Sequence, residues 1–403
     1  MSSSSHRKIV ISGWYGKHNA GDDAILDVFV DQMRSRMDCS ITVLSEEPQK
    51  VAPRPGLSAR FHEICLGRDT PYVLLNGKFF RHFRQIRDCE LFVLGGGGLL
   101  RDNTNWRNLL RLLDEIWVAK LFGRKTMLFA IGVGPFKTRL GRWLIGATAR
   151  MCDLVTVRSE HCAALLRDIG VPAGRIHVVA DPAFLLESKA VPDTELQALF
   201  AGGNKIGFYP TYALQTRYPG EAHLKQLAAG LDRLVETEGA EFVAMPMSVL
   251  DSGIDDVRTA RAIQGHMQHP EAMAIYTKRL NAAELKWATS QARLNITVRL
   301  HAMIFSLGCD VPVVAVNYEP KVANVFADFG MPQYLVELDE GLSTGLADAA
   351  STCLRNLPAA GALIHRRRTA AADSSARAFK LAKQLWNTSG HAPEGHAVGD
   401  TAR

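Results

Sequence analysis

The residues best suited to proton chemistry follow a predicted strand in the second half of the chain. Residues 293–298 form an apolar run typical of a buried strand, and Arg299 and His301 follow it where a small-residue helix begins. Arginine offers a fixed positive charge to a carboxylate or phosphate, and an imidazole gives or takes a proton near neutral pH. A lone histidine is more often structural, but an Arg-x-His pair at a strand end predicts a site that binds an anion and moves a proton.

Two further cations also come after predicted strands. Arg158 directly follows a strand predicted over 154–157, and Lys321 comes shortly after one over 313–316. Arg158 either binds an anion through two parallel hydrogen bonds or pairs with a nearby carboxylate, and we favour anion binding. A lysine usually lies on a solvated face, but Lys321 is expected at the same sheet edge as His301, which favours anion binding there too.

A glycine-rich segment over 12–23 connects the first predicted strand to the first predicted helix. Its glycines permit tight turns, and the N-terminus of the helix offers free N–H groups to an anion. The spacing is not that of a dinucleotide-binding fingerprint. Asp22 is either a ligand-binding residue or simply the cap of the helix.

Four consecutive glycines, 95–98, follow a strand predicted over 91–94. Because each glycine carries an entropic penalty on folding, the run indicates backbone that lies close to a substrate. Arg101 and Asp102 come next in the chain. They either hydrogen-bond sugar hydroxyls or an anion, or form a solvated surface pair.

Short apolar runs alternate with helical patterns along the chain, which predicts an α/β fold with parallel sheets covered on both faces. At 403 residues the chain is too long for one ordinary domain. We therefore expect two Rossmann-like, doubly wound domains that face each other across a cleft. The expected division is an N-terminal domain over 1–186, a linker over 187–204, a C-terminal domain over 205–358, a helix over 359–386 and a disordered tail over 387–403.

The composition narrows the classes of partner. A net charge of +6 suits an anionic substrate or an anionic membrane surface, and the cations do not interleave with aromatics as in nucleic-acid-binding proteins. The scattered cysteines, the absence of a signal-peptide pattern and the absence of a long apolar run predict a soluble, cytoplasmic enzyme. No metal-ligand cluster is evident, so we expect no metal and no cofactor.

These motifs, in this order, resemble the polysaccharide pyruvyltransferase family. The resemblance rests on the 12–23 segment, the glycines at 95–98, Val157-Arg158-Ser159, Arg299-Leu300-His301 and Asn317…Pro320-Lys321, and it runs from about residue 8 to residue 330. It implies a fold like that of the two-domain B-type glycosyltransferases. It also implies phosphoenolpyruvate as donor co-substrate and a cell-surface sugar as acceptor, joined as a cyclic pyruvate ketal.

The resemblance also implies roles for individual residues. His301, Ser12 and Lys321 match positions expected to be essential, and Arg158 and Arg299 match donor-binding arginines, with Lys321 assisting. His301 is the expected acid or base. The residues expected on the acceptor side are Asn19, Asp22, Gly96, Gly97, Arg101 and Asp102.

Two other functions stay open on the sequence. A nucleotide-sugar-dependent glycosyltransferase of the same architecture would use similar anion contacts, and a catalytically silent sugar- or lipid-binding module would need none of the reactive residues. If the acceptor is lipid-linked, the enzyme meets it at the inner face of the cytoplasmic membrane. Residues 74–87 mix four cations with three phenylalanines, so they form either an ordinary packed amphipathic helix or a membrane-docking surface.

Overall fold

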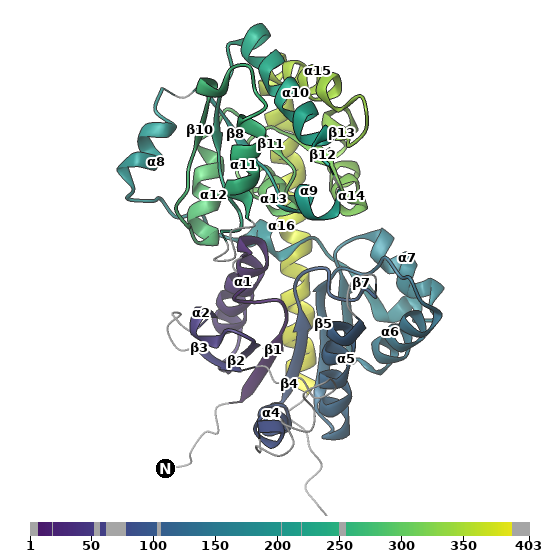
Figure 1. Cartoon of the computed structure of the whole chain (residues 1–403). Coiled ribbons are helices and arrows are strands. Elements are labelled where there is room, and N and C mark those ends of the chain that lie inside the picture. Colours follow the sequence, from purple (N-terminus) through teal and green to yellow (C-terminus); the bar gives the residue numbers. More distant parts are fainter. Residues whose placement is uncertain are drawn as a thin grey trace, which may run out of the picture.

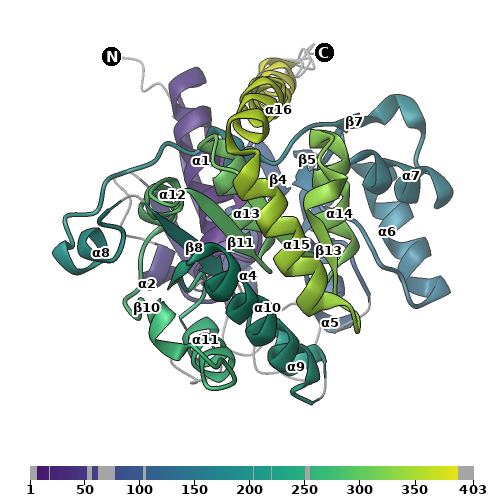
Figure 2. The same ribbon diagram turned by 90° about the horizontal axis from the view of Figure 1, so that it is seen from above.

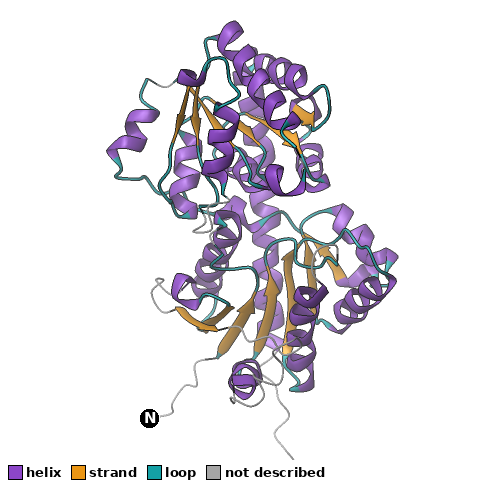
Figure 3. Ribbon diagram, in the orientation of Figure 1, coloured by secondary structure: helices purple, strands orange, loops and turns teal. Residues whose placement is uncertain are grey.

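The computed structural model describes residues 7–17, 19–51, 57–61, 78–102, 106–202, 204–218, 220–249 and 255–388. These residues form two parallel β-sheets, each with helices on both faces (Figures 1 and 3). The prediction of two doubly wound α/β domains is confirmed. No helix of the described ranges is long and apolar enough to cross a membrane.

The N-terminal sheet has the strand order β3-β2-β1-β4-β5-β6-β7. Its strands are β1 (Lys8–Ser12), β2 (Ser40–Ser45), β3 (Leu57–Phe61), β4 (Leu91–Gly95), β5 (Lys125–Ile131), β6 (Leu154–Val157) and β7 (Ile176–Val178). The order reverses direction between β1 and β4, which leaves a crevice outside the carboxyl ends of these two strands. Ligands of open α/β sheets bind in such a crevice.

The C-terminal sheet repeats the same winding, in the order β10-β9-β8-β11-β12-β13. Its strands are β8 (Lys205–Tyr209), β9 (Glu241–Ala244), β10 (Met273–Ile275), β11 (Leu294–Thr297), β12 (Val313–Asn317) and β13 (Leu335–Glu337). Its crevice lies between β8 and β11. The central strands of both sheets are buried throughout because helices cover both faces.

Helices follow most strands and carry the chain back across each sheet. In the N-terminal domain they are α1 (Ala20–Arg36), α2 (Pro48–Val51), α4 (Lys78–Arg87), α5 (Trp106–Leu121), α6 (Arg139–Met151) and α7 (Glu160–Asp168). The rest are α8 (Thr194–Leu199), α9 (Ala213–Arg217), α10 (Ala222–Glu238), α11 (Asp256–Gln264), α12 (Ala282–Ser290), α13 (Leu300–Gly308), α14 (Pro320–Phe329), α15 (Leu342–Arg355) and α16 (Leu357–Asn387).

The sequence pattern located the central elements and missed peripheral ones. The strands predicted over 91–94, 154–157 and 313–316 agree with β4, β6 and β12 to within one residue, whereas β3, β13 and α15 were not predicted. β3 and β13 are short edge strands, which carry too few buried positions to give a periodic signal. Residues 389–403, most of the predicted disordered tail, lie outside the described residues.

The segment predicted as a linker packs on the C-terminal domain and contains α8. Asp193 caps α8 and also accepts hydrogen bonds from Tyr276 (3.1 Å) and Lys278 (2.9 Å). The Lys286 ammonium donates to the carbonyl of Leu186 at 2.6 Å. The chain therefore leaves the first sheet and runs along the surface of the second before entering it.

Helix α16 joins the two domains (Figures 1 and 2). Its first half packs on the C-terminal domain, where Ile364 is buried. Its second half lies on the N-terminal sheet, with the Phe379 ring 5.1 Å from that of Phe129. The Ser375 hydroxyl donates to the backbone carbonyl of Asp181 at 2.8 Å, so this helix also positions a loop of the cleft.

Candidate functional site

The two crevices face each other and enclose a cavity of about 380 Å³, here called the central cavity. Loops that follow β1, β4 and β6 line one side, and loops that follow β8, β9, β11 and β12 line the other. Its polar lining residues are Asn19, Asp22, Arg101, Arg158, Thr211, Tyr212, Arg217, Arg299, His301, Tyr318, Glu319 and Lys321. A second space of about 790 Å³, the lateral cavity, adjoins it and shares Arg101, Arg158, Arg217 and Lys321.

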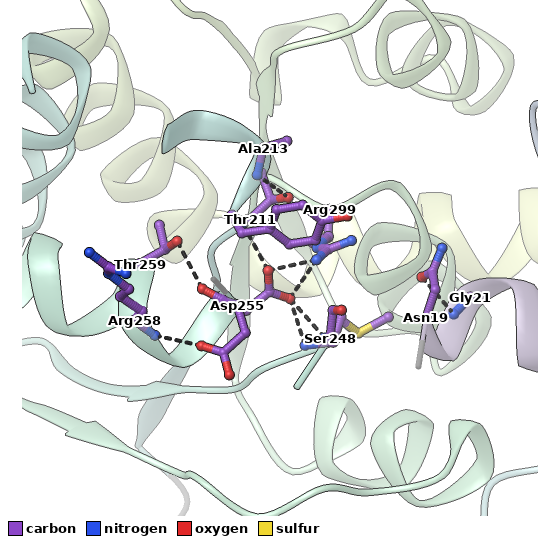
Figure 4. Close-up of polar contacts among 12 residues, drawn as sticks. Asn19, Gly21, Thr211, Ala213, Ser248, Asp255, Arg258, Thr259 and Arg299 are labelled. Atoms are coloured by element: carbon purple, nitrogen blue, oxygen red, sulfur yellow. Dashed lines mark hydrogen bonds and ion pairs between the residues drawn. The ribbon is translucent and has the colours of Figure 1, made fainter. Parts of the chain in front are cut away.

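Arg299 precedes α13 and is held by a buried carboxylate. Its Nη2 lies 2.6 and 2.7 Å from the two carboxylate oxygens of Asp256, which is fully buried. Burial alone would lower the pKa of Arg299, but Asp256 outweighs it and raises the pKa. The Nε of Arg299 is buried and has no hydrogen-bond partner among the described residues, so the guanidinium keeps a donor free. Figure 4 shows Arg299 between Thr211 and Ser248, across from Asn19 and Gly21 of α1.

Asp256 also organises the loops around Arg299. Its carboxylate accepts backbone hydrogen bonds from Tyr212 (2.9 Å), Met247 (3.1 Å) and Ser248 (2.9 Å). One buried carboxylate thus ties the loops after β8 and β9 to the arginine after β11. The side chain of Arg299 is therefore fixed before any ligand arrives.

Arg158 has a similar arrangement in the N-terminal domain. Its Nη1 donates to Asp181 at 2.6 Å, and the other carboxylate oxygen of Asp181 accepts the backbone N–H of Ala183 at 3.0 Å. Burial would raise the pKa of Asp181, but Arg158 and His301 outweigh it and the pKa is lowered. Arg158 therefore pairs with a carboxylate and also lines both cavities, which unites the two interpretations that its sequence context allowed.

His301 lies where the two domains meet. Its Nε2 is buried, stands 3.8 Å from the Asp181 carboxylate and has no hydrogen-bond partner among the described residues. Its ring lies against Gly21, where any Cβ would overlap the imidazole, so only glycine lets α1 approach α13 this closely. Burial lowers the pKa of His301 to about 4, although Asp181 opposes the shift. The imidazole is therefore neutral at pH 7 in the unliganded cavity.

Asp22 is another titratable group of the central cavity whose pKa is shifted. Burial raises its pKa to about 6, and Arg158 and Lys321 oppose that shift. Asn19, the N-cap of α1, donates to one Asp22 oxygen at 2.5 Å. The other oxygen lies so close to Gly97 that a Cβ there would stand 2.7 Å away. Gly97 thus lets a buried carboxyl reach the cavity, and the helix cap is Asn19 rather than Asp22.

A group of cations stands between the two cavities. The Lys321 ammonium lies 2.6 Å from Glu319, which also pairs with Arg217. Burial lowers the pKa of Lys321, and the nearby arginines add to the effect. Arg101 forms no hydrogen bond or ion pair through its side chain with any described residue, and burial lowers its pKa. Such a group suits a ligand with more than one negative charge.

Three residues predicted at the site do not line either cavity. Ser12, still within β1, is fully buried, and its hydroxyl has no partner among the described residues. Gly96 packs against Ile25, with a positive φ of 76° that favours glycine. Neither residue lines a cavity because the chain turns toward the cavity only after each of them.

The third is Asp102, which is bonded to a neighbouring loop. Its carboxylate accepts the backbone N–H groups of Lys137 (2.5 Å) and Thr138 (2.7 Å) and the Thr138 hydroxyl (2.5 Å). It therefore fixes the loop that precedes α6. Its neighbour Arg101 points into both cavities instead.

Four charged partners were missed on the sequence: Asp181, Asp256, Arg217 and Glu319. Asp256 lies in a stretch, 247–268, that carries no recognisable motif. Asp181 comes shortly after β7 and directly before a proline. That position near a strand end is the one sequence signal that could have identified it. An isolated carboxylate in a loop resembles any surface acid until the fold brings an arginine to it.

Comparison with known proteins agrees with this geometry. Residues 19–320 match the family model described as polysaccharide pyruvyl transferase. The chain belongs to the polysaccharide pyruvyl transferase family. This confirms the resemblance seen in the sequence and places the protein among the transferases of polysaccharide synthesis.

This member of the pyruvyl transferase family is also similar to individual relatives and solved structures. The amylovoran biosynthesis protein AmsJ of Erwinia amylovora is 25% identical over 368 residues, which cover 81% of this chain and 87% of AmsJ. The UDP-GlcNAc 2-epimerase of Methanocaldococcus jannaschii superposes with a TM-score of 0.63 at 13% identity, covering 94% of this chain and 99% of that structure. The UDP-GlcNAc 2-epimerase of Neisseria meningitidis, bound to UDP-GlcNAc, superposes with a TM-score of 0.64 at 9% identity. The match covers 95% of this chain and 100% of that structure. The expected B-type glycosyltransferase-like fold is thereby confirmed.

Proposed function

We propose that this protein transfers the pyruvyl group of phosphoenolpyruvate to a sugar of a cell-surface polysaccharide or of its lipid-linked precursor, and closes a cyclic pyruvate ketal. One observation carries the proposal: His301, whose buried Nε2 has no hydrogen-bond partner among the described residues, lies beside a group of cations in one cavity. The donor carries a carboxylate and a phosphate, and its reaction begins with protonation of carbon. The site therefore needs anion-binding groups and a proton carrier in one place.

The donor is expected where the central and lateral cavities meet. Arg101 and Arg158 line both cavities, and Lys321 lies between them. Arg158 and Arg299 are held by Asp181 and Asp256, so a ligand meets guanidinium groups that are already oriented. Arg101, which has no such partner, supplies an uncompensated charge.

The reaction balances with inorganic phosphate as the second product. A proton is added to the methylene carbon of phosphoenolpyruvate, and one acceptor hydroxyl oxygen bonds to the adjacent carbon as its own proton leaves. A second hydroxyl oxygen then bonds to the same carbon while the carbon–oxygen bond to phosphate breaks, the proton of that hydroxyl passes to the departing phosphate, and the ring closes. Each step develops charge next to the arginines described above.

We assign the proton on carbon to His301 and removal of the hydroxyl proton to Asp22. In the unliganded site the pKa of His301 is about 4, so it is neutral at pH 7. A bound donor adds negative charge, which raises that pKa and favours proton uptake by the imidazole. Asp22, with a pKa of about 6, is mostly ionised at pH 7 and is available as a base.

The test is release of inorganic phosphate from phosphoenolpyruvate in the presence of candidate sugar acceptors. Calorimetry in buffers of different ionisation enthalpy should also show that binding of phosphoenolpyruvate takes up a proton, and that His301→Gln abolishes the uptake. Phosphate release that needs no acceptor, or no release with any acceptor, would contradict the proposal.

A nucleotide-sugar-dependent glycosyltransferase is the alternative, favoured by the fold that this chain shares with structures bound to UDP or UDP-sugars, such as Anabaena HepE. Thermal unfolding separates the two. A ligand at a hundred times its dissociation constant stabilises the folded state by about 2.7 kcal/mol. Phosphoenolpyruvate should raise the melting temperature and UDP-glucose should leave it unchanged; the opposite result would favour the glycosyltransferase.

A further inference from the structure

The start of α6 exposes two large apolar side chains to solvent. Leu140 and Trp143 are each 62% exposed. They stand three residues apart, so they are neighbours on one side of the helix. The opposite side of α6, which includes Ile145 and Ala149, is buried in the N-terminal domain. The exposed pair therefore contributes nothing to the core.

Cations surround this apolar pair. Lys137, Arg139 and Arg142 are exposed, and none forms an ion pair with a described residue. Helix α6 and the loop over 132–138 contain no acidic residue. Apolar side chains next to uncompensated cations complement the surface of an anionic bilayer, which offers negative headgroups over hydrocarbon.

This surface adjoins an entrance to the site. Phe136 and Arg142 line the lateral cavity, whose walls are largely apolar and include Val133, Leu165 and Phe329. Because β5 delivers the chain to the carboxyl edge of the sheet, α6 begins on the side where the loops line the two cavities. Asp102 fixes the intervening loop through its bonds to Lys137 and Thr138, so the position of the surface is tied to the cavity.

We propose that residues 135–143, the α6 surface, dock on an anionic phospholipid bilayer, and that a lipid-linked acceptor enters the lateral cavity from there. The second part rests on the proposed function; the first does not.

The α6 surface replaces residues 74–87 as the docking region. Residues 74–77 lie outside the described residues, and the rest form α4, at the end of the N-terminal domain remote from the cleft (Figure 1). Ile86 is fully buried, and both Arg84 and Arg87 pair with Asp88, at 3.5 and 2.8 Å. A bilayer at α4 would face away from both cavities.

The test is co-sedimentation of the full-length protein with vesicles of phosphatidylcholine alone or mixed with phosphatidylglycerol. Two double variants remove the features of the α6 surface: Leu140→Ser with Trp143→Ser, and Lys137→Glu with Arg139→Glu. Arg84→Glu with Arg87→Glu makes the same change in charge on α4 and is the matched control. None of these six residues lines a cavity.

We expect binding to the anionic vesicles that weakens with salt and falls at least about tenfold in both α6 variants, because each cation near an anionic bilayer contributes about a fivefold factor. The control should bind like the parent. Loss of binding in the control alone, or unchanged binding in the α6 variants, would overturn the proposal. So would a change from dimer to monomer in the Leu140→Ser, Trp143→Ser variant, which would identify the surface as a contact between two copies.

Activity separates the two parts of the proposal. Pyruvyl transfer to a short water-soluble acceptor should survive in the α6 variants, whereas transfer to a lipid-linked acceptor in vesicles should fall with vesicle binding. If no pyruvyl transfer is found at all, the vesicle result still decides the docking surface. Equal activity of parent and α6 variants on the lipid-linked acceptor would contradict entry from this side.

Discussion

Arg158 and Arg299 each follow a strand of their own domain and pair with a carboxylate, but the two carboxylates differ in their other hydrogen bonds. Asp256, beside Arg299, also accepts three backbone N–H groups from the loops after β8 and β9. Asp181, beside Arg158, accepts one, and it faces His301 at 3.8 Å. The C-terminal pair is therefore built into the framework of its domain, whereas the N-terminal pair stands next to the group that we expect to move protons.

This difference indicates how one cavity combines rigidity with chemistry. A buried ion pair adds little net stability, but removal of one partner leaves a buried charge uncompensated. At Asp256 that loss would also free three backbone donors. At Asp181 it would chiefly change the electrostatic surroundings of Arg158 and His301.

The largest effect is expected at His301, between the two pairs. His301→Gln should lower kcat for phosphate release by about a hundredfold to ten-thousandfold, the usual contribution of a general acid or base. The folded protein should persist because the imidazole makes no hydrogen bond within the described residues. His177→Gln, on β7 and outside both cavities, is the control. A kcat near that of the parent would remove His301 from the mechanism.

The comparison of the two carboxylates is tested by unfolding in urea. Asp256→Asn should lower the free energy of unfolding by about 3–5 kcal/mol, as expected when one partner of a buried pair is lost. Asp181→Asn should lower it less, because it releases one backbone donor rather than three. Equal losses, or a larger loss at Asp181, would show that the two pairs are held alike.

Asp22 and His301 should give opposite pH dependence of stability. The pKa of Asp22 is raised to about 6, so the stability that it contributes is complete below pH 4 and is lost as the pH rises through 6. The pKa of His301 is lowered to about 4, so its penalty appears as the pH falls from 6.5 through 4. At 1.36 kcal/mol per pKa unit, each effect is about 3 kcal/mol.

The free energy of unfolding of Asp22→Asn and His301→Gln, measured at pH 4 and pH 8, checks this sign. Relative to the parent, the free energy of unfolding of Asp22→Asn should rise more at pH 8 than at pH 4. That of His301→Gln should rise more at pH 4 than at pH 8. If the change in the free energy of unfolding favoured the same pH in both variants, the pKa values of Asp22 and His301 would not be shifted in opposite directions.

The smallest structural effect is expected at Arg101, whose side chain forms no hydrogen bond or ion pair with a described residue. Arg101→Gln should change the free energy of unfolding by no more than about 0.5 kcal/mol, as is usual where no buried network is broken. It should still raise KM for phosphoenolpyruvate by about tenfold or more, because a hydrogen bond to a charged group contributes about 1.5–3 kcal/mol. Arg299→Lys, which keeps a charge beside Asp256, is the variant whose KM is compared with that of Arg101→Gln. An unchanged KM for phosphoenolpyruvate in Arg101→Gln would place Arg101 outside the donor site.

The contrast between Arg299 and Asp256 shows how far sequence reasoning reached at the site. Arg299, His301, Arg158 and Lys321 were found because each stands just after a strand, and parallel strands end at one edge of a sheet. Asp256 and Arg217 were not found, because they are end residues of the helices α11 and α9 and carry no motif signal. Ser12, Gly96 and Asp102 lie outside the lining of both cavities, because nearness along the chain does not fix which way a residue faces.

The sequence by itself determined the alternation of strands and helices, the two parallel sheets and the strand-end residues that reach the cleft, because apolar periodicity and glycine-rich turns are local properties. Only the tertiary structure decided which carboxylate holds which arginine, that Gly21 makes room for the His301 ring, and that α6 carries an exposed apolar surface. Those features depend on contacts between residues that are far apart in the chain. The shifted pKa values of Asp22 and His301 also depend on the tertiary structure, because burial causes both shifts.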